Sequence, residues 1–323
     1  MKTVSLAVPA FNEEENVPLL CQEISRVFSG VDLDWEIIFV DDGSTDRTFE
    51  VISRLARKDS RIKGIRLSRN FGHQAAILAG IHHAKGDCVI SMDCDLQHPP
   101  SRLPDFIQEW RSGSQIVIGI REAQKETFFK RLSSGSFYRL YNLLTAQKLE
   151  MHSADFRLLD RSVINQLLCF PESDIFLRGV VSWVGFRLSY VRYAQPPRKH
   201  GDSKYSLSKM IKLALKGTVS FSSRPLYLAL AMGGVFIAFS IAYAAYILCD
   251  WCLGGKPVTG WASIIFLILI ATGFQLLSLG VIGVYVASLF EEAKRRPRFI
   301  VWESVGLEEP PAERPEGKRI TPK

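Results

Sequence analysis

Short apolar runs alternate with amphipathic stretches over the first 120 residues of the chain. The apolar runs predict strands at 3–8, 35–40, 62–67, 87–92 and 115–120, and the stretches between them predict helices at 13–28, 46–57, 73–83 and 103–111. A further strand is expected at 184–193. Such alternation is typical of a mostly parallel sheet with helices on both faces, so an α/β domain is predicted.

Two long uncharged runs follow, at 226–248 and 262–290. They hold 23 and 29 residues, and a helix needs about 20 apolar residues to cross a bilayer. The alternative is a pair of buried core helices. The lengths and the charged ends favour a two-helix transmembrane hairpin.

The net charge of +7 comes largely from the flanks of these two runs. The positive-inside rule then places both termini and the globular domain in the cytoplasm, and no signal peptide is apparent. Nucleic acid is disfavoured as a partner, because the basic residues cluster beside the spans and not on a recognition motif. The flanking residues are Lys204, Lys209, Lys212, Lys216 and Arg224 before the first run, and Lys294, Arg295, Arg296 and Arg298 after the second.

These patterns divide the chain into a globular domain at 1–200, an amphipathic juxtamembrane segment at 201–224, the hairpin at 225–292, and a basic flank with a disordered tail at 293–323. Residues 206–218 are expected to form an interfacial helix. Residues 128–144 fit either a second interfacial helix or a helix packed on the sheet. Cys249 and Cys252 form a lone CxxC between the spans, for which a redox role and chance placement both stay open.

Three polar clusters follow predicted strands: PAFNEEEN at 9–16, DDGSTD at 41–46 and DCDLQ at 93–97. Ligands of parallel sheets bind beyond the carboxyl ends of the strands, so we expect the clusters to form one site. In the third cluster, Asp93, Asp95 and Gln97 supply the hard oxygen ligands that Mg²⁺ or Mn²⁺ prefers. A bare DxD pair also occurs in solvated loops. The prediction of a metal site therefore depends on the two other polar clusters expected beside it.

The second cluster suits a nucleoside. An aspartate at a strand end, such as Asp41, can accept hydrogen bonds from a base or a ribose hydroxyl. Gly43 permits a tight turn, and Ser44 or Asp46 can cap the next helix. A GxGxxG fingerprint and a Walker A loop are both absent from the sequence, which disfavours a nicotinamide or P-loop domain.

PAFNE, DDGS, DCDLQ and RKHGDSKYS at 198–206 together resemble the family 2 glycosyltransferases of the GT-A fold. The nearer resemblance is to the polyprenyl-phosphate glycosyltransferases, which include dolichol-phosphate mannose synthases and bacterial bactoprenol glucosyltransferases. It covers the chain except its tail, because some members also end in two spans. A Q-x-x-R-W motif of the processive synthases is absent, so one sugar per turnover is expected.

The resemblance implies a role for each matching position. A nucleotide pocket would contain Pro9, Asn12, Glu13, Asp41, Asp42 and Asp93. A metal would be held by Asp93, Asp95 and Gln97, and the catalytic residues would be Asp155, Arg198 and Lys204, with Ser203 and Tyr205 fixing the loop. Arg121 and Arg131 would hold the acceptor phosphate, with plain surface charge as the alternative. His200 is interpreted as a loop residue, with a phosphate contact as the alternative.

The expected reaction is an inverting, metal-dependent transfer of one sugar to polyprenyl phosphate on the cytoplasmic leaflet. UDP-glucose is the favoured donor, because SADFRLLDR at 153–161 resembles the glucosyltransferases. GDP-mannose, UDP-GlcNAc and an aminoarabinose donor stay open. A homo-oligomer is expected from the resemblance alone. The alternatives of another class are a non-catalytic nucleotide-binding membrane scaffold and a lipid carrier.

Overall fold

A central sheet organises the computed structural model, which describes residues 2–122, 153–172, 175, 177–194, 222–253 and 260–307. The described residues form eight strands in the order β7-β5-β6-β4-β1-β2-β3-β8. The strands are β1 (Thr3–Ala10), β2 (Asp34–Asp41), β3 (Ile62–Leu67), β4 (Cys88–Ser91), β5 (Ile116–Arg121), β6 (Ser153–Asp160), β7 (Leu188–Tyr193) and β8 (Val301–Val305).

The expected mostly parallel α/β architecture is confirmed. Strands β4, β1, β2 and β3 run parallel to one another, as do β5 and β7. The register pairs Ala10 with Asp41 and Ala7 with Ser91, so the carboxyl ends of β1, β2 and β4 lie side by side. The three polar clusters predicted from the sequence therefore leave the sheet at one edge.

Two strands differ from the sequence prediction. Strand β6, within SADFRLLDR, inserts antiparallel between β4 and β5. Strand β8 pairs antiparallel with β3, although residues 301–305 fall in the segment expected to be flank and tail. Both pairings join segments far apart in the sequence, which local hydrophobic pattern does not report.

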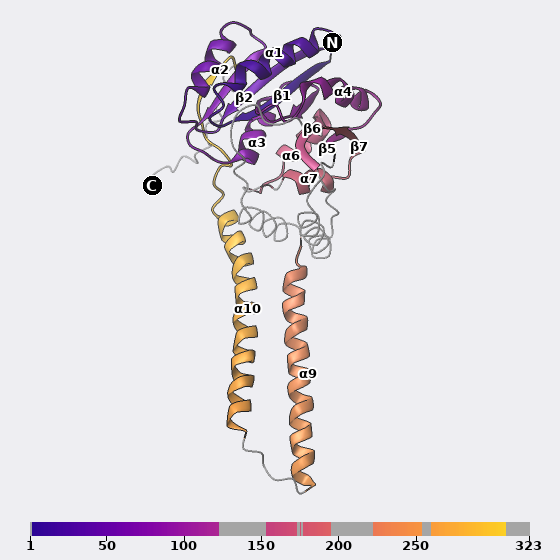
Figure 1. Cartoon of the computed structure of the whole chain (residues 1–323), viewed down its shortest axis with the longest axis vertical. Coiled ribbons are helices and arrows are strands. Elements are labelled where there is room, and N and C mark those ends of the chain that lie inside the picture. The colour runs from indigo at the N-terminus through magenta and orange to yellow at the C-terminus, as the bar shows by residue number, and fades with distance from the viewer. Residues whose placement is uncertain are drawn as a thin grey trace, which may run out of the picture.

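Helices cover both faces of the sheet, as predicted (Figure 1). Strand β1 is buried on both sides: Leu6 and Val8 pack in one core with α1, while Ala7 packs in a second core with α3. The helices of the globular part are α1 (Asn16–Phe28), α2 (Thr48–Ala56), α3 (His73–His83), α4 (Leu103–Arg111), which follows a 3₁₀ turn at Pro100–Arg102, α6 (Arg161–Leu168) and α7 (Leu177–Trp183).

Helix α3 lies unusually close to the sheet, and Gly80 makes this approach possible. A Cβ atom at Gly80 would lie 2.8 Å from the Cβ of Ala7 in β1. Because α3 begins at His73, beside the carboxyl ends of the strands, the packing at Gly80 also sets where the start of that helix lies.

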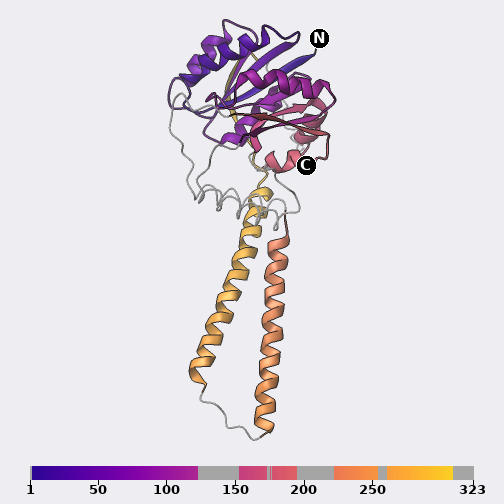
Figure 2. The same ribbon diagram turned by 45° about the vertical axis from the view of Figure 1, so that its right-hand side comes forward.

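Two long apolar helices, α9 (Arg224–Cys252) and α10 (Trp261–Ala293), extend side by side from the globular part (Figures 1 and 2). The rings of Phe236 and Phe274 lie 5.3 Å apart between them. Segments Arg224–Tyr243 and Ile270–Ala293 are long and apolar enough to cross a membrane. No residue in the most apolar 18-residue stretch of either segment is buried, which contradicts the alternative of two core helices.

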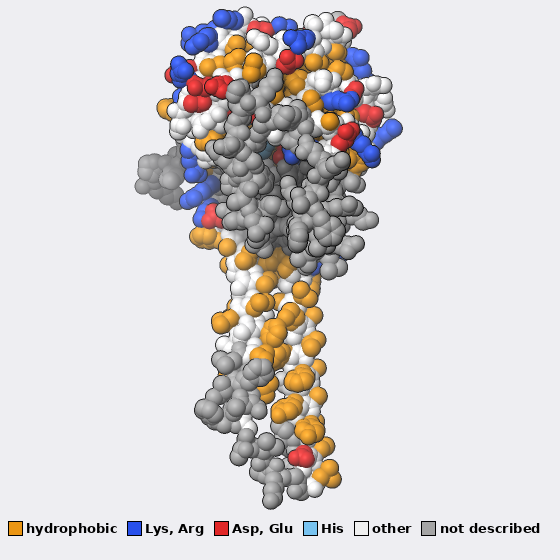
Figure 3. Space-filling model, viewed as in Figure 1, with side chains coloured by type: hydrophobic (Ala, Val, Ile, Leu, Met, Phe, Trp, Pro, Cys, Tyr) orange, Lys and Arg blue, Asp and Glu red, His pale blue; other side chains and the backbone are white. Residues whose placement is uncertain are grey.

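On the face shown in Figure 3, hydrophobic side chains lie along the described parts of both helices. Leu230 is 72% exposed and Leu276 is 63% exposed. Apolar surface on this scale is stable in lipid, not in water. The two helices therefore fit the hairpin predicted from the sequence.

The chain returns from α10 to the globular part. The Arg298 guanidinium donates to the carbonyls of Phe170 and Glu172, and Ser68 N donates to Ile300 O at 2.9 Å. Strand β8 then joins the sheet beside β3. The start of α9 and the end of α10 both lie toward the globular part (Figures 1 and 2).

We predict that Gly80→Ala destabilises the protein by about 1–2 kcal/mol, because overpacking against Ala7 outweighs the better helix propensity of alanine. The measurement is the thermal unfolding midpoint of the full chain in detergent. Gly30→Ala is the control, since no atom lies within 4 Å of a Cβ built there. Equal midpoints for the two variants would contradict the close approach of α3.

Candidate active site

The loops that follow β1 and β2 are locked together by hydrogen bonds. Asn12 N donates to Ser44 Oγ at 2.9 Å, and Thr45 N donates to Asn12 Oδ1 at 2.9 Å. Glu13 N donates to Thr48 Oγ1 at 2.9 Å. Asn12 adopts a positive φ of 58°, a conformation that asparagine tolerates better than most residues. The predicted clusters PAFNE and DDGS therefore form one structural unit.

Asp41 stabilises this unit from the interior of the protein. Its side chain is fully buried, Oδ1 accepts from Ser44 N at 2.8 Å, and Oδ2 lies 3.4 Å from Arg66 Nε. Burial raises the pKa of Asp41, while Ser44 and Arg66 oppose that rise. Gly43 has a φ of 72°, and a Cβ there would lie 2.6 Å from the backbone of Arg69. The predicted tight turn at Gly43 is confirmed.

Asp42 holds the loop that leads into α3. Its two carboxylate oxygens accept from Phe71 N at 2.7 Å and from Gly72 N at 2.9 Å. Burial raises the pKa of Asp42, and these two amides oppose the rise. Since both oxygens are used by the backbone, Asp42 shapes the site by fixing the start of α3.

The DCDLQHPP segment folds back on itself directly after β4. Leu96 adopts a positive φ of 62°, and Asp95 Oδ1 accepts from Gln97 N at 3.1 Å. The turn brings His98, which is fully buried, beneath Asp93. A non-glycine residue in this conformation is strained, and such strain is typical of functional loops.

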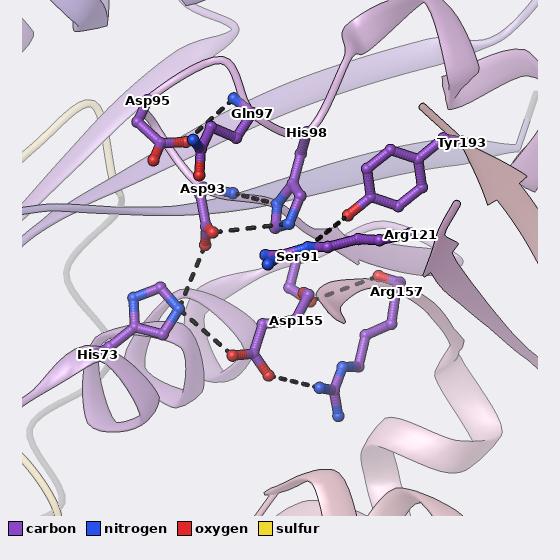
Figure 4. Close-up of polar contacts among 10 residues, drawn as sticks. All are labelled: His73, Ser91, Asp93, Asp95, Gln97, His98, Arg121, Asp155, Arg157 and Tyr193. Atoms are coloured by element: carbon purple, nitrogen blue, oxygen red, sulfur yellow. Dashed lines mark hydrogen bonds and ion pairs between the residues drawn. The ribbon is translucent and has the colours of Figure 1, made fainter. Parts of the chain in front are cut away.

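His98 fixes the backbone of Asp93 and faces its side chain (Figure 4). Nδ1 accepts from Asp93 N at 2.9 Å, so the proton of the neutral ring must lie on Nε2, which is 3.6 Å from Asp93 Oδ2. The ring stacks on Phe156 with centroids 5.0 Å apart. Burial lowers the pKa of His98, and Arg121 adds to that effect. His98 was not among the site residues predicted from the sequence.

His73 joins the DxD segment to β6 (Figure 4). Its Nε2 lies 3.2 Å from Asp93 Oδ1 and 3.7 Å from Asp155 Oδ2. Burial acts to raise the pKa of Asp93, but the imidazoles of His98 and His73 outweigh it and hold that pKa well below its usual range. His73 was predicted only as the first residue of a helix.

Asp155 is held in place by its neighbours in the sheet. Its Oδ1 accepts from Arg157 Nη2 at 2.6 Å, and its backbone carbonyl accepts from Ser91 Oγ at 2.6 Å. Asp155 and Arg157 are both almost fully buried and lie two residues apart, on one face of β6. The ion pair therefore fixes the direction of the Asp155 carboxylate.

Arg121 ends β5 and extends toward the same cluster (Figure 4). Its Nε donates to Tyr193 Oη at 3.3 Å. This arrangement places a cationic group beside Asp93 and Asp155. The acceptor-phosphate role expected of Arg121 from the sequence stays a prediction.

These elements enclose a cleft of ≈ 280 Å³. Among the described residues, four predicted positions are not part of its lining: Asn12, Asp41, Gln97 and Asp155. The predicted residues Pro9, Glu13, Asp42, Asp93 and Asp95 line it, with His73 and Asn70. A carboxylate-rich wall repels a diphosphate unless a cation lies between them.

The donor set of the cleft fits a hard divalent cation. Asp93 and Asp95 supply carboxylate oxygens, which Mg²⁺ and Mn²⁺ prefer. Within the described ranges, no three His, Cys, Asp or Glu side chains form a complete cage for an ion. A cation bound here would therefore draw its remaining ligands from substrate phosphates and water.

The model of glycosyl transferase family 2 matches residues 5–168. The chain is 39% identical to the uncharacterized glycosyltransferase YkcC of Bacillus subtilis over 94% of each chain. The chain belongs to glycosyl transferase family 2. Among other members, it is 36% identical to the bactoprenol glucosyl transferase of Shigella phage SfV, over 92% of this chain and 97% of that protein.

The family 2 assignment confirms that the protein is a glycosyltransferase. It is also 35% identical to the prophage bactoprenol glucosyl transferase homolog of Escherichia coli, over 92% of this chain and 98% of that one. Among solved structures, glucosyl-3-phosphoglycerate synthase from Mycobacterium tuberculosis is similar with a TM-score of 0.46 and 19% identity, over 68% of this chain and 76% of that one.

Several predicted positions of this family 2 enzyme lie outside the described residues. These are Arg131, Arg198, His200, Ser203, Lys204 and Tyr205, together with the predicted helices at 128–144 and 206–218 and most of the tail. Their roles stay predictions.

We predict that His98→Ala destabilises the protein by about 2–4 kcal/mol, because Asp93 N loses its acceptor and a buried void forms against Phe156. His98→Asn keeps an acceptor oxygen and should recover part of the loss. The measurement is thermal unfolding of the purified full chain. His83→Ala is the control, with an expected loss below about 1 kcal/mol. Equal losses for His98→Ala and His83→Ala would contradict the role given to His98.

Proposed function

We propose that the protein transfers one sugar from a nucleotide sugar to a polyprenyl phosphate at a membrane surface. One observation carries the proposal: an acidic cleft belongs to the same chain as an apolar hairpin, and the match to bactoprenol glucosyl transferases spans both parts. The hairpin keeps the cleft near the interface, where the phosphate of a membrane-embedded lipid lies.

The donor would bind at the end of the cleft formed by the loops after β1 and β2. Pro9, Glu13 and Asp42 line that end, and Asn12 and Asp41 hold its wall. Asp93 and Asp95, with Gln97, would hold Mg²⁺ or Mn²⁺ against the diphosphate. When bound, such a cation supplies charge stabilisation as the sugar–phosphate bond breaks. Arg198 and Lys204 are expected to contact the phosphates from the other side.

The acceptor would bind on the Arg121 side of Asp93. A phosphate monoester has its second pKa near about 6, so at neutral pH it is already largely dianionic and needs positioning more than proton removal. Arg121 would bind that phosphate, with Arg131 as a second candidate. His73 and the ion-paired Asp155 would orient the attacking oxygen toward the anomeric carbon.

A single displacement would invert the configuration of the sugar. The phosphate oxygen forms the new bond to the anomeric carbon as the bond to the donor diphosphate breaks, and the nucleoside diphosphate leaves. UDP-glucose is the proposed donor, from the resemblance to bactoprenol glucosyl transferases. The proposed orientation places the sheet and both flanks of the hairpin in the cytoplasm, beside the basic residues Lys294, Arg295 and Arg296.

The test is a donor panel with the purified full chain, undecaprenyl phosphate and Mg²⁺ or Mn²⁺. Each of UDP-glucose, GDP-mannose, UDP-GlcNAc and an aminoarabinose donor is supplied, and the lipid product is measured by mass spectrometry. We expect glucosyl lipid with UDP-glucose. Product from another donor would correct the sugar, and binding of nucleotide without any lipid product would favour the scaffold alternative.

We predict that Asp95→Ala, or excess chelator, lowers turnover by at least about 100-fold, because the charge developing on the leaving diphosphate loses several kcal/mol of stabilisation. Asp105→Ala is the matched control, since Asp105 lies in α4 and forms an exposed ion pair with Arg102. Its turnover should be unchanged. Full turnover of the Asp95 variant would overturn the metal-dependent mechanism.

A further inference from the structure

Strand β8 carries a bulge opposite the end of β3. Arg66 pairs with Glu303 and the next residue, Leu67, pairs with Val301, so Trp302 is the extra residue of β8. A bulge re-aims the side chain of the extra residue and is common beside functional sites. Here the Trp302 ring lies against the guanidinium of Arg66, with 5.0 Å between the ring centroid and Cζ.

The Arg66 guanidinium contacts two aromatic rings. Phe49 of α2 lies on it at 5.6 Å, and Trp302 lies on it at 5.0 Å. Its Nε is 3.4 Å from Asp41 Oδ2. Neither Arg66 Nε nor Asp41 Oδ2 makes a hydrogen bond within the described part of the chain, although both atoms are buried. The position of this cation over Asp41 therefore depends on the stacking.

Hydrogen bonds connect Asp41 to the wall of the cleft. Its other oxygen accepts from Ser44 N, Ser44 Oγ accepts from Asn12 N, and Asp42 N donates to Ala10 O at 2.9 Å. Ala10 and Asp42 line the cleft. If Arg66 moved away, Asp41 would be an uncompensated buried charge, and the loop that it holds through Ser44 would be destabilised.

The geometry points to Trp302 as a positioning residue for nucleotide binding: a strand that follows the membrane hairpin holds Arg66 on Asp41 and so fixes the donor end of the cleft. This inference rests on the proposed function, in which that end binds a nucleoside diphosphate. It deepens that function, because it makes the segment after α10 a part of the donor site.

The test measures donor and acceptor kinetics with the full chain in detergent. We expect Trp302→Ala to raise the KM for the nucleotide sugar about two- to fivefold, as an exposed cation–π contact implies, with little change in kcat or in the KM for polyprenyl phosphate. Trp302→Phe keeps a ring and should restore most of the loss. Val301→Ala, in the same strand, is the control for strand integrity.

A double variant distinguishes a positioning role of Trp302 from direct contact between its ring and the nucleotide. On Arg66→Met, the further change Trp302→Ala should have no added effect, because Trp302 acts through Arg66. An equal loss on both backgrounds would mean that the ring touches the nucleotide itself and would overturn the inference. The same holds if Val301→Ala raises the donor KM as much as Trp302→Ala does.

Direct binding of UDP and GDP, measured by calorimetry, distinguishes the two proposals. If the unaltered chain binds neither nucleotide, the proposed function fails and the inference fails with it. If the unaltered chain binds UDP and Trp302→Ala binds it equally well, only the inference fails. Weaker UDP binding by Trp302→Ala, with recovery in Trp302→Phe, supports both.

Discussion

The parallel register of β1, β2 and β4 places several carboxylates at one edge of the sheet. The other polar groups of the site stabilise these carboxylates. Like charges at close range are costly unless each has its own partner. Four of the aspartates at the site have different partners, Asp155 coming from the antiparallel β6: backbone amides hold Asp42, Ser44 and Arg66 hold Asp41, two imidazoles hold Asp93, and Arg157 holds Asp155. The acidic edge is thus held in one arrangement by the protein's own groups, as the proposed function requires.

Periodicity along the chain was enough to predict the α/β class, because β1 and β2 are buried on both faces and the helices between strands are amphipathic. The residue types at the strand ends were enough to predict the turn at Gly43 and to single out the DxD segment, since both depend on neighbouring residues. The partners of those carboxylates were not predictable in this way. His98 and Arg157 are buried polar residues whose roles arise only once β4, β5 and β6 are side by side.

The same distinction explains the two missed strands. Strand β6 alternates apolar and polar residues, which is itself a strand pattern. Its antiparallel place between β4 and β5 is set by pairing with those strands. Strand β8 is short and mostly exposed, so its own composition gives little signal. In both cases long-range pairing decided the structure. The acidic cleft was predicted as one site, while its depth, its wall and its link to the segment after α10 required the tertiary fold.

Strand β8 follows the apolar hairpin in the chain, and this order has a consequence during synthesis. Until residues 301–305 have left the ribosome, β3 is an open edge whose backbone groups are available to any passing strand. The sheet is therefore completed only after both apolar helices have been synthesised. A chain that stalls before that point exposes the edge of β3, which is prone to aggregation.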